Sequence, residues 1–269
     1  MSSKYDARAE VVRSLVCVGL DTDIHALPEA YQKEAMPQFA FNRWIIEQTH
    51  EYVAAYKLNT AFYEMCGEQG LRELKLTTDH LRSEHPDIFT ICDAKRGDIG
   101  STNDAYARAI FDGWGFDAVT LHPYVGREAL EPFLARKDRV SIILCRTSNP
   151  GAGELQDLTV DKKPLWQVIA ERVSQEWNAN GNCMLVVGAT YPEELRRVRE
   201  IAGDMTLLVP GIGAQGGDAK ATVTAALNRV GRGMIINSSR GIIFSESPRE
   251  VARTLRDTIN AYRQNLFFT

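Results

Sequence analysis

The sequence has no long apolar run, no tract of low complexity and no recognisable targeting segment. Its longest apolar stretches are only a few residues, whereas a membrane-spanning helix needs about 20. The stretch from Met1 to Leu15 also lacks the apolar segment of a signal peptide. We therefore expect no membrane partner and a cytoplasmic location.

Cysteine is scarce and is not paired in any motif. The five cysteines, Cys17, Cys66, Cys92, Cys145 and Cys183, show no CxxC spacing, and most of them lie inside short apolar runs. Such residues are typical of buried thiols in a reducing compartment. A disulfide framework or a zinc site built from these cysteines is not expected.

The chain also has no strong excess of charge of either sign. Its formal net charge is -4, with 25% charged and 44% hydrophobic residues. This balance argues against broad binding to nucleic acid, although it permits a local cationic pocket. The length of 269 residues fits one α/β barrel domain, for which about 250 residues is common.

Near-continuous apolar runs alternate with helix-length amphipathic segments, such as 39–52 and 71–83. Runs of this kind are typical of parallel strands that are covered on both faces. There are about eight, the number that closes a (β/α)8 TIM barrel. No GxGxxG follows the first run, which disfavours a doubly wound sheet. We expect one barrel domain over residues 1–269, with strands in the runs 15–21, 53–59, 89–95, 118–123, 140–148, 183–190, 205–211 and 233–240.

Charged residues crowd the end of the third run. If this run is extended, Asp93 and Lys95 lie on one face, and Asp98 follows after Gly97 lets the backbone turn. A carboxylate beside an ammonium keeps the ammonium protonated. Such a cluster could stabilise a developing negative charge and then donate a proton. The alternative is a salt bridge at the rim of the barrel, with no chemistry.

Two glycine-rich stretches follow the last two runs, at 210–218 and 237–241. Their backbone N–H groups could approach a phosphate, Arg240 adds a forked cationic donor, and the loops after strands seven and eight of such barrels often bind phosphate. Plain turns are the alternative. The segment 147–154 could contact a heterocycle or form a simple turn, and residues 154–182 have no assigned role.

The pattern Asp93-x-Lys95-x-x-Asp98-Ile99-x-x-Thr102 resembles the DxKxxDIxxT signature of orotidine 5′-phosphate decarboxylases. The stretch DAKRGDIGST is similar to that of their longer bacterial subgroup, type 2. The resemblance extends along the chain, because matching residues occur in the family's order. These are Asp21, Lys57, Asn59, Ser148, PGIGAQGGD and SSRG.

The resemblance implies the loss of CO2 from orotidine 5′-phosphate to give uridine 5′-phosphate, the last step of de novo UMP synthesis. Such a carboxy-lyase requires no cofactor and no metal. Lys95 would stabilise and protonate the C6 carbanion, and Asp93, Asp98 and Lys57 would complete the charged array. A homodimer with shared active sites is implied as well, in which Asp98, Ile99 and Thr102 reach the partner's site.

The same resemblance implies the substrate contacts. Asp21, Asn59 and Thr102 would lie at the ribose, and Ser148 at the edge of the pyrimidine. Gln215 and Arg240 would hold the phosphate. The full set of substrate-binding residues is Asp21, Asn59, Ile99, Thr102, Ser148, Pro210, Gln215, Gly216, Ser239 and Arg240.

Two other functions are consistent with parts of this pattern. Mg2+-dependent sugar-phosphate decarboxylases and aldolases of the same suprafamily share the barrel and DxKxxD, but tend to have a carboxylate where this chain has Lys57. A lysine there places positive charge where the cation would bind. A non-catalytic nucleotide-binding barrel is the other alternative, but a pure binder has no use for so costly a charge cluster.

Overall fold

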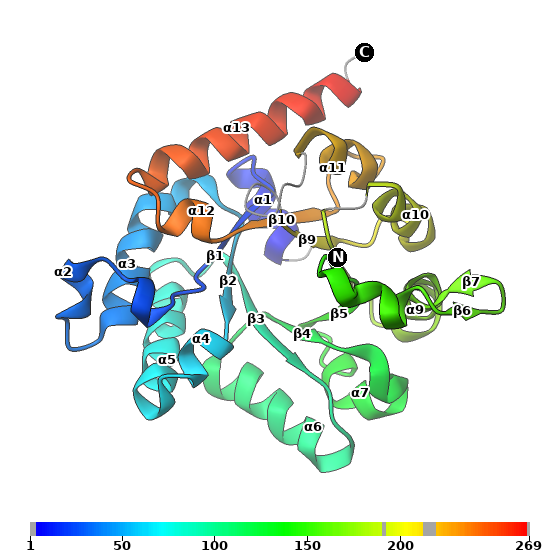
Figure 1. The fold of residues 1–269 in the computed structure, drawn as a ribbon, viewed down its shortest axis with the longest axis horizontal. Helices are drawn as coiled ribbons and strands as arrows, with labels where there is room; N and C mark the ends of the chain where they lie inside the picture. The colour runs from blue at the N-terminus through cyan, green and yellow to red at the C-terminus, as the bar shows by residue number, and fades with distance from the viewer. Residues whose placement is uncertain (1–3, 190–191, 212–218, 268–269) are drawn as a thin grey trace.

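A closed barrel of parallel strands forms the centre of the molecule, as predicted (Figure 1). The computed structural model describes residues 4–189, 192–211 and 219–267. Around the barrel the strands follow the order β1-β10-β9-β8-β5-β4-β3-β2. They are β1 (Val16–Gly19), β2 (Ala55–Asn59), β3 (Phe89–Arg96), β4 (Ala118–Leu121), β5 (Val140–Arg146), β8 (Cys183–Val187), β9 (Leu207–Pro210) and β10 (Met234–Ser238).

Helices surround the strands on every side in Figure 1. The longer ones are α1 (Lys4–Val11), α3 (Pro37–Thr49), α5 (Gly67–Glu84), α6 (Gly100–Ala107), α7 (Gly126–Leu134), α9 (Leu165–Arg172), α10 (Pro192–Ala202), α11 (Ala219–Ala226) and α13 (Pro248–Phe267). Single turns form α2 (Glu29–Gln32), α4 (Ala61–Glu64), α8 (Gly153–Gln156) and α12 (Arg240–Ile243). The predicted helices at 39–52 and 71–83 correspond to α3 and α5.

Shorter helical turns and one hairpin complete the described part of the chain. The 3-10 turns are η1 (Ile24–Ala26), η2 (His50–Tyr52), η4 (Pro123–Val125) and η5 (Pro150–Ala152). Two π-helical turns, η3 (Arg108–Trp114) and η6 (Val173–Trp177), continue α6 and α9. The strands β6 (Thr159–Val160) and β7 (Lys163–Pro164) pair as an antiparallel hairpin outside the barrel.

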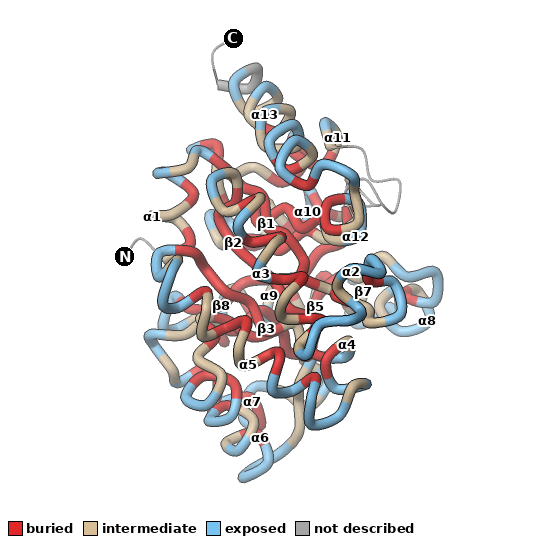
Figure 2. The backbone as a smooth tube through the Cα atoms, turned by 90° about the vertical axis from the view of Figure 1, so that its left-hand side faces the viewer, coloured by how far each residue is buried: buried red, intermediate tan, exposed pale blue. Residues whose placement is uncertain are grey.

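The apolar runs are buried because helices cover the strands outside and side chains fill the barrel inside. Every residue of β1, β4 and β8 is buried, and Figure 2 shows burial concentrated at the strands. From α3, Phe41, Ile45 and Ile46 are fully buried in the same core. Burying one such side chain contributes about 1.5–3 kcal/mol. None of the helices in the described parts of the chain has both the length and the apolar character needed to cross a membrane.

Parallel pairing brings the carboxyl ends of the strands to one edge of the barrel. In the register, Asn59 at the end of β2 lies opposite Asp93 in β3, and Asn237 in β10 lies opposite Pro210 in β9. The polar residues that end the apolar runs therefore share this edge, which is the position of active sites in (β/α)8 barrels.

Candidate active site

A pocket of about 510 Å³ opens at the carboxyl ends of the strands, and we call it the rim pocket. The structure brings most of the predicted site residues together there. Those that line it are Asp21, Lys57, Asn59, Asp93, Lys95, Ser148, Pro210, Ser239 and Arg240. Asp98, Ile99 and Thr102 do not line it, and Gln215 and Gly216 lie outside the described residues.

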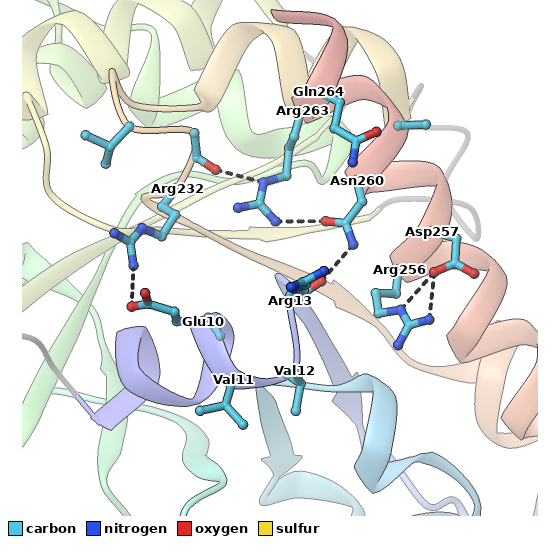
Figure 3. Close-up of a pocket in the computed structure, with 14 residues that line it drawn as sticks. Glu10, Val11, Val12, Arg13, Arg232, Arg256, Asp257, Asn260, Arg263 and Gln264 are labelled. Carbon is cyan, nitrogen blue, oxygen red and sulfur yellow. Dashed lines mark hydrogen bonds and ion pairs between the residues drawn. The ribbon is translucent and has the colours of Figure 1, made fainter. Parts of the chain in front are cut away.

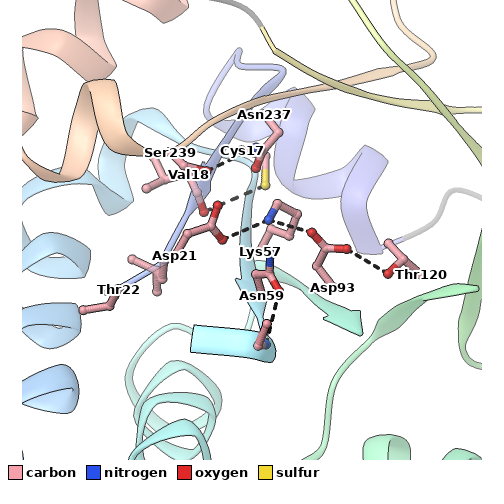
Figure 4. Close-up of polar contacts among 12 residues, drawn as sticks. Cys17, Val18, Asp21, Thr22, Lys57, Asn59, Asp93, Thr120, Asn237 and Ser239 are labelled. Carbon is pink, nitrogen blue, oxygen red and sulfur yellow. Dashed lines mark hydrogen bonds and ion pairs between the residues drawn. The ribbon is translucent and has the colours of Figure 1, made fainter. Parts of the chain in front are cut away.

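Lys57 lies at the bottom of the charged array, on β2, and is only 4% exposed. Its Nζ donates hydrogen bonds to Asp21 Oδ1 and Asp93 Oδ2, each at 3.0 Å, so that it lies between the two carboxylates in Figure 4. Burial alone would lower the pKa of Lys57, but Asp21 and Asp93 outweigh burial and raise this pKa well above its usual range. Lys57 is therefore a fixed positive charge.

Asp93 joins the two lysines. Its Oδ1 accepts hydrogen bonds from Lys95 Nζ at 2.7 Å and from Thr120 Oγ1 at 2.9 Å, while its Oδ2 accepts from Lys57. Burial opposes ionisation of Asp93, but Lys57 and Lys95 hold its pKa below the usual range for a carboxyl group. Asp93 is thus an ionised carboxylate whose two oxygens both have fixed partners.

Lys95 is the member of the array that reaches open space. Its side chain is 49% exposed, whereas that of Lys57 is 5% exposed. The backbone of Lys95 has a φ of +47°, and the pairing of β3 with β4 shifts register between Cys92 and Arg96. The Lys95 N–H donates to Thr120 Oγ1 at 3.0 Å, which holds this turn in place.

A positive φ at a lysine costs about 1–3 kcal/mol, and such strain gathers at functional sites. Regular alternation would have placed Asp93 and Lys95 on one face without this turn. The two residues do meet, as predicted, but through a bulge that the alternation did not indicate. Thr120 fixes both Asp93 and Lys95, and sequence reasoning missed it because a threonine at the end of a strand is an ordinary β-residue.

Asp98 is not part of this array within its own chain. Its Oδ1 accepts from the Ile99 N–H at 2.7 Å, and its backbone N–H donates to Asn103 Oδ1 at 2.9 Å. The Asn103 side chain, which is fully buried, donates in turn to the carbonyls of Asp98 and Ala129, both at 2.6 Å. These bonds fix the segment in an outward position, where Ile99 is 67% exposed. Thr102 is exposed as well.

The loop after β5 carries Ser148 into the rim pocket, and two further polar residues of this loop, Thr147 and Asn149, also line the pocket. Gln156 of α8 holds the loop: its Oε1 accepts from the Thr147 N–H at 2.9 Å, and its Nε2 donates to Thr147 Oγ1 at 2.8 Å. Thr147 Oγ1 donates to Asn149 Oδ1 at 2.6 Å. Gln156 belongs to the segment that had no predicted role.

Arg146, at the end of β5, anchors the same segment. It is only 4% exposed and forms a two-pronged contact with Glu194 of α10, at 2.6 Å and 3.1 Å. Its Nη1 also lies 3.1 Å from Asp157 Oδ1. A buried guanidinium with these partners holds the end of β5, Asp157 and α10 in fixed relative positions. Arg146 therefore supports the loop rather than facing the pocket, and sequence reasoning did not identify it.

Another part of the rim pocket is formed by residues at or just after the ends of β9 and β10. Pro210, Gly211, Ser239 and Arg240 line it, and Arg240 is exposed at its edge. The backbone is close-packed here, since a Cβ on Gly19 would lie 1.9 Å from Ser239 Oγ. The part of Arg240 in binding a phosphate stays a prediction.

A larger hollow of about 970 Å³ lies at the other end of the barrel, between α1, α13 and residues 230–232. We call it the N-terminal groove (Figure 3). It contains none of the predicted site residues that the structure describes. Three of its arginines have partners: Arg232 pairs with Glu10 at 3.2 Å, Arg256 with Asp257 at 2.8 Å, and Arg263 Nε donates to the Gly231 carbonyl at 2.8 Å. Its size alone does not mark it as the active site.

Comparisons with family models, curated proteins and solved structures all match this chain to one family. Residues 14–255 match the model of the orotidine 5′-phosphate decarboxylase / HUMPS family. Proteins named orotidine 5′-phosphate decarboxylase from Cellvibrio japonicus and Cupriavidus taiwanensis are 45% and 47% identical, over 93% of this chain and 94% of each relative. OMP decarboxylase of Leishmania donovani superposes with a TM-score of 0.87 at 43% identity, covering 97% of both chains. A putative orotidine-monophosphate decarboxylase of Toxoplasma gondii gives 0.92 at 38% identity, covering 99% of this chain and 98% of the other.

Proposed function

This chain belongs to the orotidine 5′-phosphate decarboxylase / HUMPS family, and we propose that it removes CO2 from orotidine 5′-phosphate, giving uridine 5′-phosphate, with Lys95 as the proton donor. The observation that carries the assignment of roles is the array Lys57–Asp93–Lys95, in which both oxygens of Asp93 are engaged and the ammonium of Lys95 lines the pocket. The chain acts as one barrel domain in this proposal.

The reaction needs positive charge at one carbon atom. When the C6–CO2 bond breaks, its electron pair stays on C6 in an orbital that the pyrimidine π-system does not delocalise. The protein therefore has to stabilise a localised anion and then protonate it. Lys95 can do both, because its ammonium is oriented by Asp93 at 2.7 Å and its backbone by Thr120 at 3.0 Å. Donation of its proton to C6 leaves Lys95 as a neutral amine. This amine takes up a proton from water after the product has left.

Lys57 and Asp21 make the array rigid. The ion pairs of Lys57 with Asp21 and Asp93 hold both carboxylates in place beside Lys95. Electrostatic catalysis depends on charges that need not reorganise during the reaction. Asp93 also brings negative charge toward the carboxylate that leaves.

The remaining pocket residues suit the rest of the nucleotide. Ser148 and its neighbours after β5 face the side where the pyrimidine edge would lie, and Asn59 and Asp21 offer polar groups for the ribose. Arg240 and Ser239 would hold the phosphate, together with Gln215 and Gly216. Binding energy from the phosphate, far from C6, would be used to order the pocket and exclude water.

The metal-dependent alternative is less compatible with this pocket. Lys57 places a buried, protonated ammonium 3.0 Å from both Asp21 and Asp93, the carboxylates that a divalent cation would need. A cation there would be repelled by that ammonium at short range. No observation favours a sugar phosphate over the nucleotide, and the curated relatives at 45–47% identity carry the decarboxylase name.

We also propose that the protein is a homodimer whose subunits share their active sites, and that it is located in the cytoplasm. Two observations support the shared site: Asp98, Ile99 and Thr102 lie outside the rim pocket of their own chain, and Asn103 fixes their segment in an outward position. Burial of an apolar side chain as exposed as Ile99 would favour association. The buried thiols of Cys17 and Cys92 suit a reducing compartment.

The experiment is a spectrophotometric assay. Purified protein in EDTA-containing buffer should convert the ultraviolet spectrum of orotidine 5′-phosphate into that of uridine 5′-phosphate. An unchanged spectrum in EDTA that changes on adding Mg2+ would refute the metal-free reaction, and no change under either condition would refute the substrate.

The shared site has a separate test in mixed subunits. Lys95→Ala and Asp98→Ala chains are each expected to be inactive, and their mixture should regain about a quarter of the activity if Asp98 acts in the partner's site. The figure is the statistical share of intact sites in a random mixture of dimers (about one site in four). No rescue would refute the shared site and leave the reaction untouched.

A further inference from the structure

Three of the chain's five histidines gather outside the barrel, where α3 and η2 meet the end of α5. The ring of His85 lies 4.6 Å from that of His50 and 5.9 Å from that of His80. Glu47 of α3 belongs to the same cluster. The reaction proposed for the rim pocket makes no use of any of these residues.

The nitrogen atoms of this cluster have an unusual environment. The Nε2 atoms of His80 and His85 are buried, and neither has a hydrogen-bond partner among the described residues. Buried polar atoms in folded proteins nearly always have a partner, so each exception needs an explanation. Two such imidazole nitrogens in one cluster indicate that a ligand completes it.

The spacing suits a single metal ion. Glu47, His80 and His85 each offer one ligand atom, and these three atoms lie within 4.8 Å of one another. Two ligands at about 2.1 Å from a tetrahedral Zn2+ are separated by about 3.4 Å. Small side-chain rotations would close the difference. Two imidazoles and one carboxylate form a donor set that Zn2+ accepts, with water in the fourth position.

Charge and access also suit a cation. Glu47 and His80 line a groove of about 670 Å³, which gives an ion a path from solvent. Glu34 and Glu84 on its walls add negative charge, while Arg43 opposes it.

We propose that Glu47, His80 and His85 form a binding site for Zn2+ or a similar divalent cation, which joins α3 to the C-terminal end of α5. The site is structural and separate from the rim pocket. It stands on this geometry alone and does not depend on the proposed reaction. It also leaves the prediction of metal-free chemistry in the rim pocket unchanged.

Titration of the full-length, metal-free protein with Zn2+ tests the site. Calorimetry should give one ion per chain, and saturating Zn2+ should raise the thermal midpoint by about 5 °C, because the ion binds only the folded state. Tetrahedral Co2+ in the same site should show visible d–d absorption. Decarboxylation in EDTA should be unaffected, so failure of this site and failure of the proposed function give different results.

Variants decide which residues bind. His80→Ala and His85→Ala should weaken Zn2+ binding by about 100-fold or more, and Glu47→Gln by about 10-fold. His25→Ala, at an exposed histidine in η1, is the matched control and should bind like the parent. Absence of Zn2+ binding in the parent would overturn the proposal, as it would mean that the imidazoles hold only water. Equal binding in the His80→Ala and His85→Ala variants would overturn it too, by placing the ion elsewhere.

Discussion

The two ends of the barrel carry hollows of opposite character. The N-terminal groove is larger, about 970 Å³ against about 510 Å³ for the rim pocket. Its charges form ordinary surface pairs, such as Arg232 with Glu10 and Arg256 with Asp257. In the rim pocket, by contrast, the buried Lys57 pairs with Asp93, whose side chain is 12% exposed, and Asp93 also pairs with the exposed ammonium of Lys95.

Under the proposed function, the active site of this barrel is marked by its charges and not by its volume. Taking charges out of water is costly, and a protein keeps them buried only where geometry compensates for that cost. The compensation is visible in the rim pocket, where each charge of the array has at least one partner of opposite sign within 3.0 Å. Matched substitutions at the two ends should therefore have very different effects.

The largest difference is expected for an aspartate at each end. Asp93→Asn removes the charge between Lys57 and Lys95, so decarboxylation should fall by about 10³-fold or more. The free energy of unfolding should also fall, by about 3 kcal/mol, because the buried Lys57 loses a partner. Asp257→Asn in the N-terminal groove should leave activity unchanged and alter stability by no more than about 0.5 kcal/mol. Assay and urea unfolding measure both. Comparable losses at the two ends would contradict the contrast.

Arginines give the next comparison. Arg240→Ala should raise KM for orotidine 5′-phosphate by about 10–100-fold, because a charge-assisted contact to the phosphate is worth about 1.5–3 kcal/mol. Arg232→Ala at the other end should leave KM within about twofold of the parent. Steady-state kinetics with the nucleotide, repeated with the phosphate-free nucleoside, separate the two ends. If Arg240→Ala loses as much with the nucleoside as with the nucleotide, the arginine does not bind phosphate.

Acid should remove more stability through the rim pocket than through the groove. The folded-state pKa of Asp93 is held below its usual range, so its contribution to stability is present above the unfolded-state pKa of about 3.9 and is lost as pH falls through the lower folded-state pKa. Between pH 5 and pH 2, roughly, the parent should lose about 2 kcal/mol more stability than Asp93→Asn. Asp257→Asn should follow the parent. Parallel curves for the parent and Asp93→Asn would show that the array does not depress this pKa.

The smallest difference between the two ends is expected when one glutamine is replaced at each end. Gln156→Ala removes two hydrogen bonds to Thr147 and should loosen the loop that carries Ser148. We expect KM to rise by about 10-fold with a smaller change in kcat and little loss of stability, since a neutral hydrogen bond is worth about 1 kcal/mol. Gln264→Ala in the N-terminal groove is the control and should be silent. An unchanged KM for Gln156→Ala would mean that the loop holds its position without Gln156.

Much of this contrast was accessible from the sequence. The barrel could be predicted because parallel strands buried on both faces leave continuous apolar runs, and the polar residues ending those runs, Lys57, Asp93 and Lys95, had to share one edge. The positive φ of Lys95 could not be predicted, because it depends on the hydrogen bond to Thr120 of another strand. The glycine-rich stretch after β9 indicated a phosphate site, but most of it lies outside the described residues.

Other parts of the site depend on contacts that no local pattern reveals. Gln156 acts on Thr147 across a turn, and Arg146 is fixed by Glu194, 48 positions further along the chain. Gln156 lies in the segment 154–182, which sequence reasoning left without a role, and Arg146 lies in the run 140–148, which was predicted only as a strand. The role of Asp98 stays a prediction, because the active site in which we expect it to act belongs to a second chain.

Lys95→Ala is the most direct test of the central claim that this ammonium stabilises and protonates the carbanion. Lys95 lies at the rim and is half exposed, so the variant should keep its fold and its midpoint of urea unfolding. Its turnover at saturating orotidine 5′-phosphate should fall by about 10⁴-fold or more, since both charge stabilisation and proton donation are removed. A folded Lys95→Ala protein with turnover within about tenfold of the parent would contradict the account.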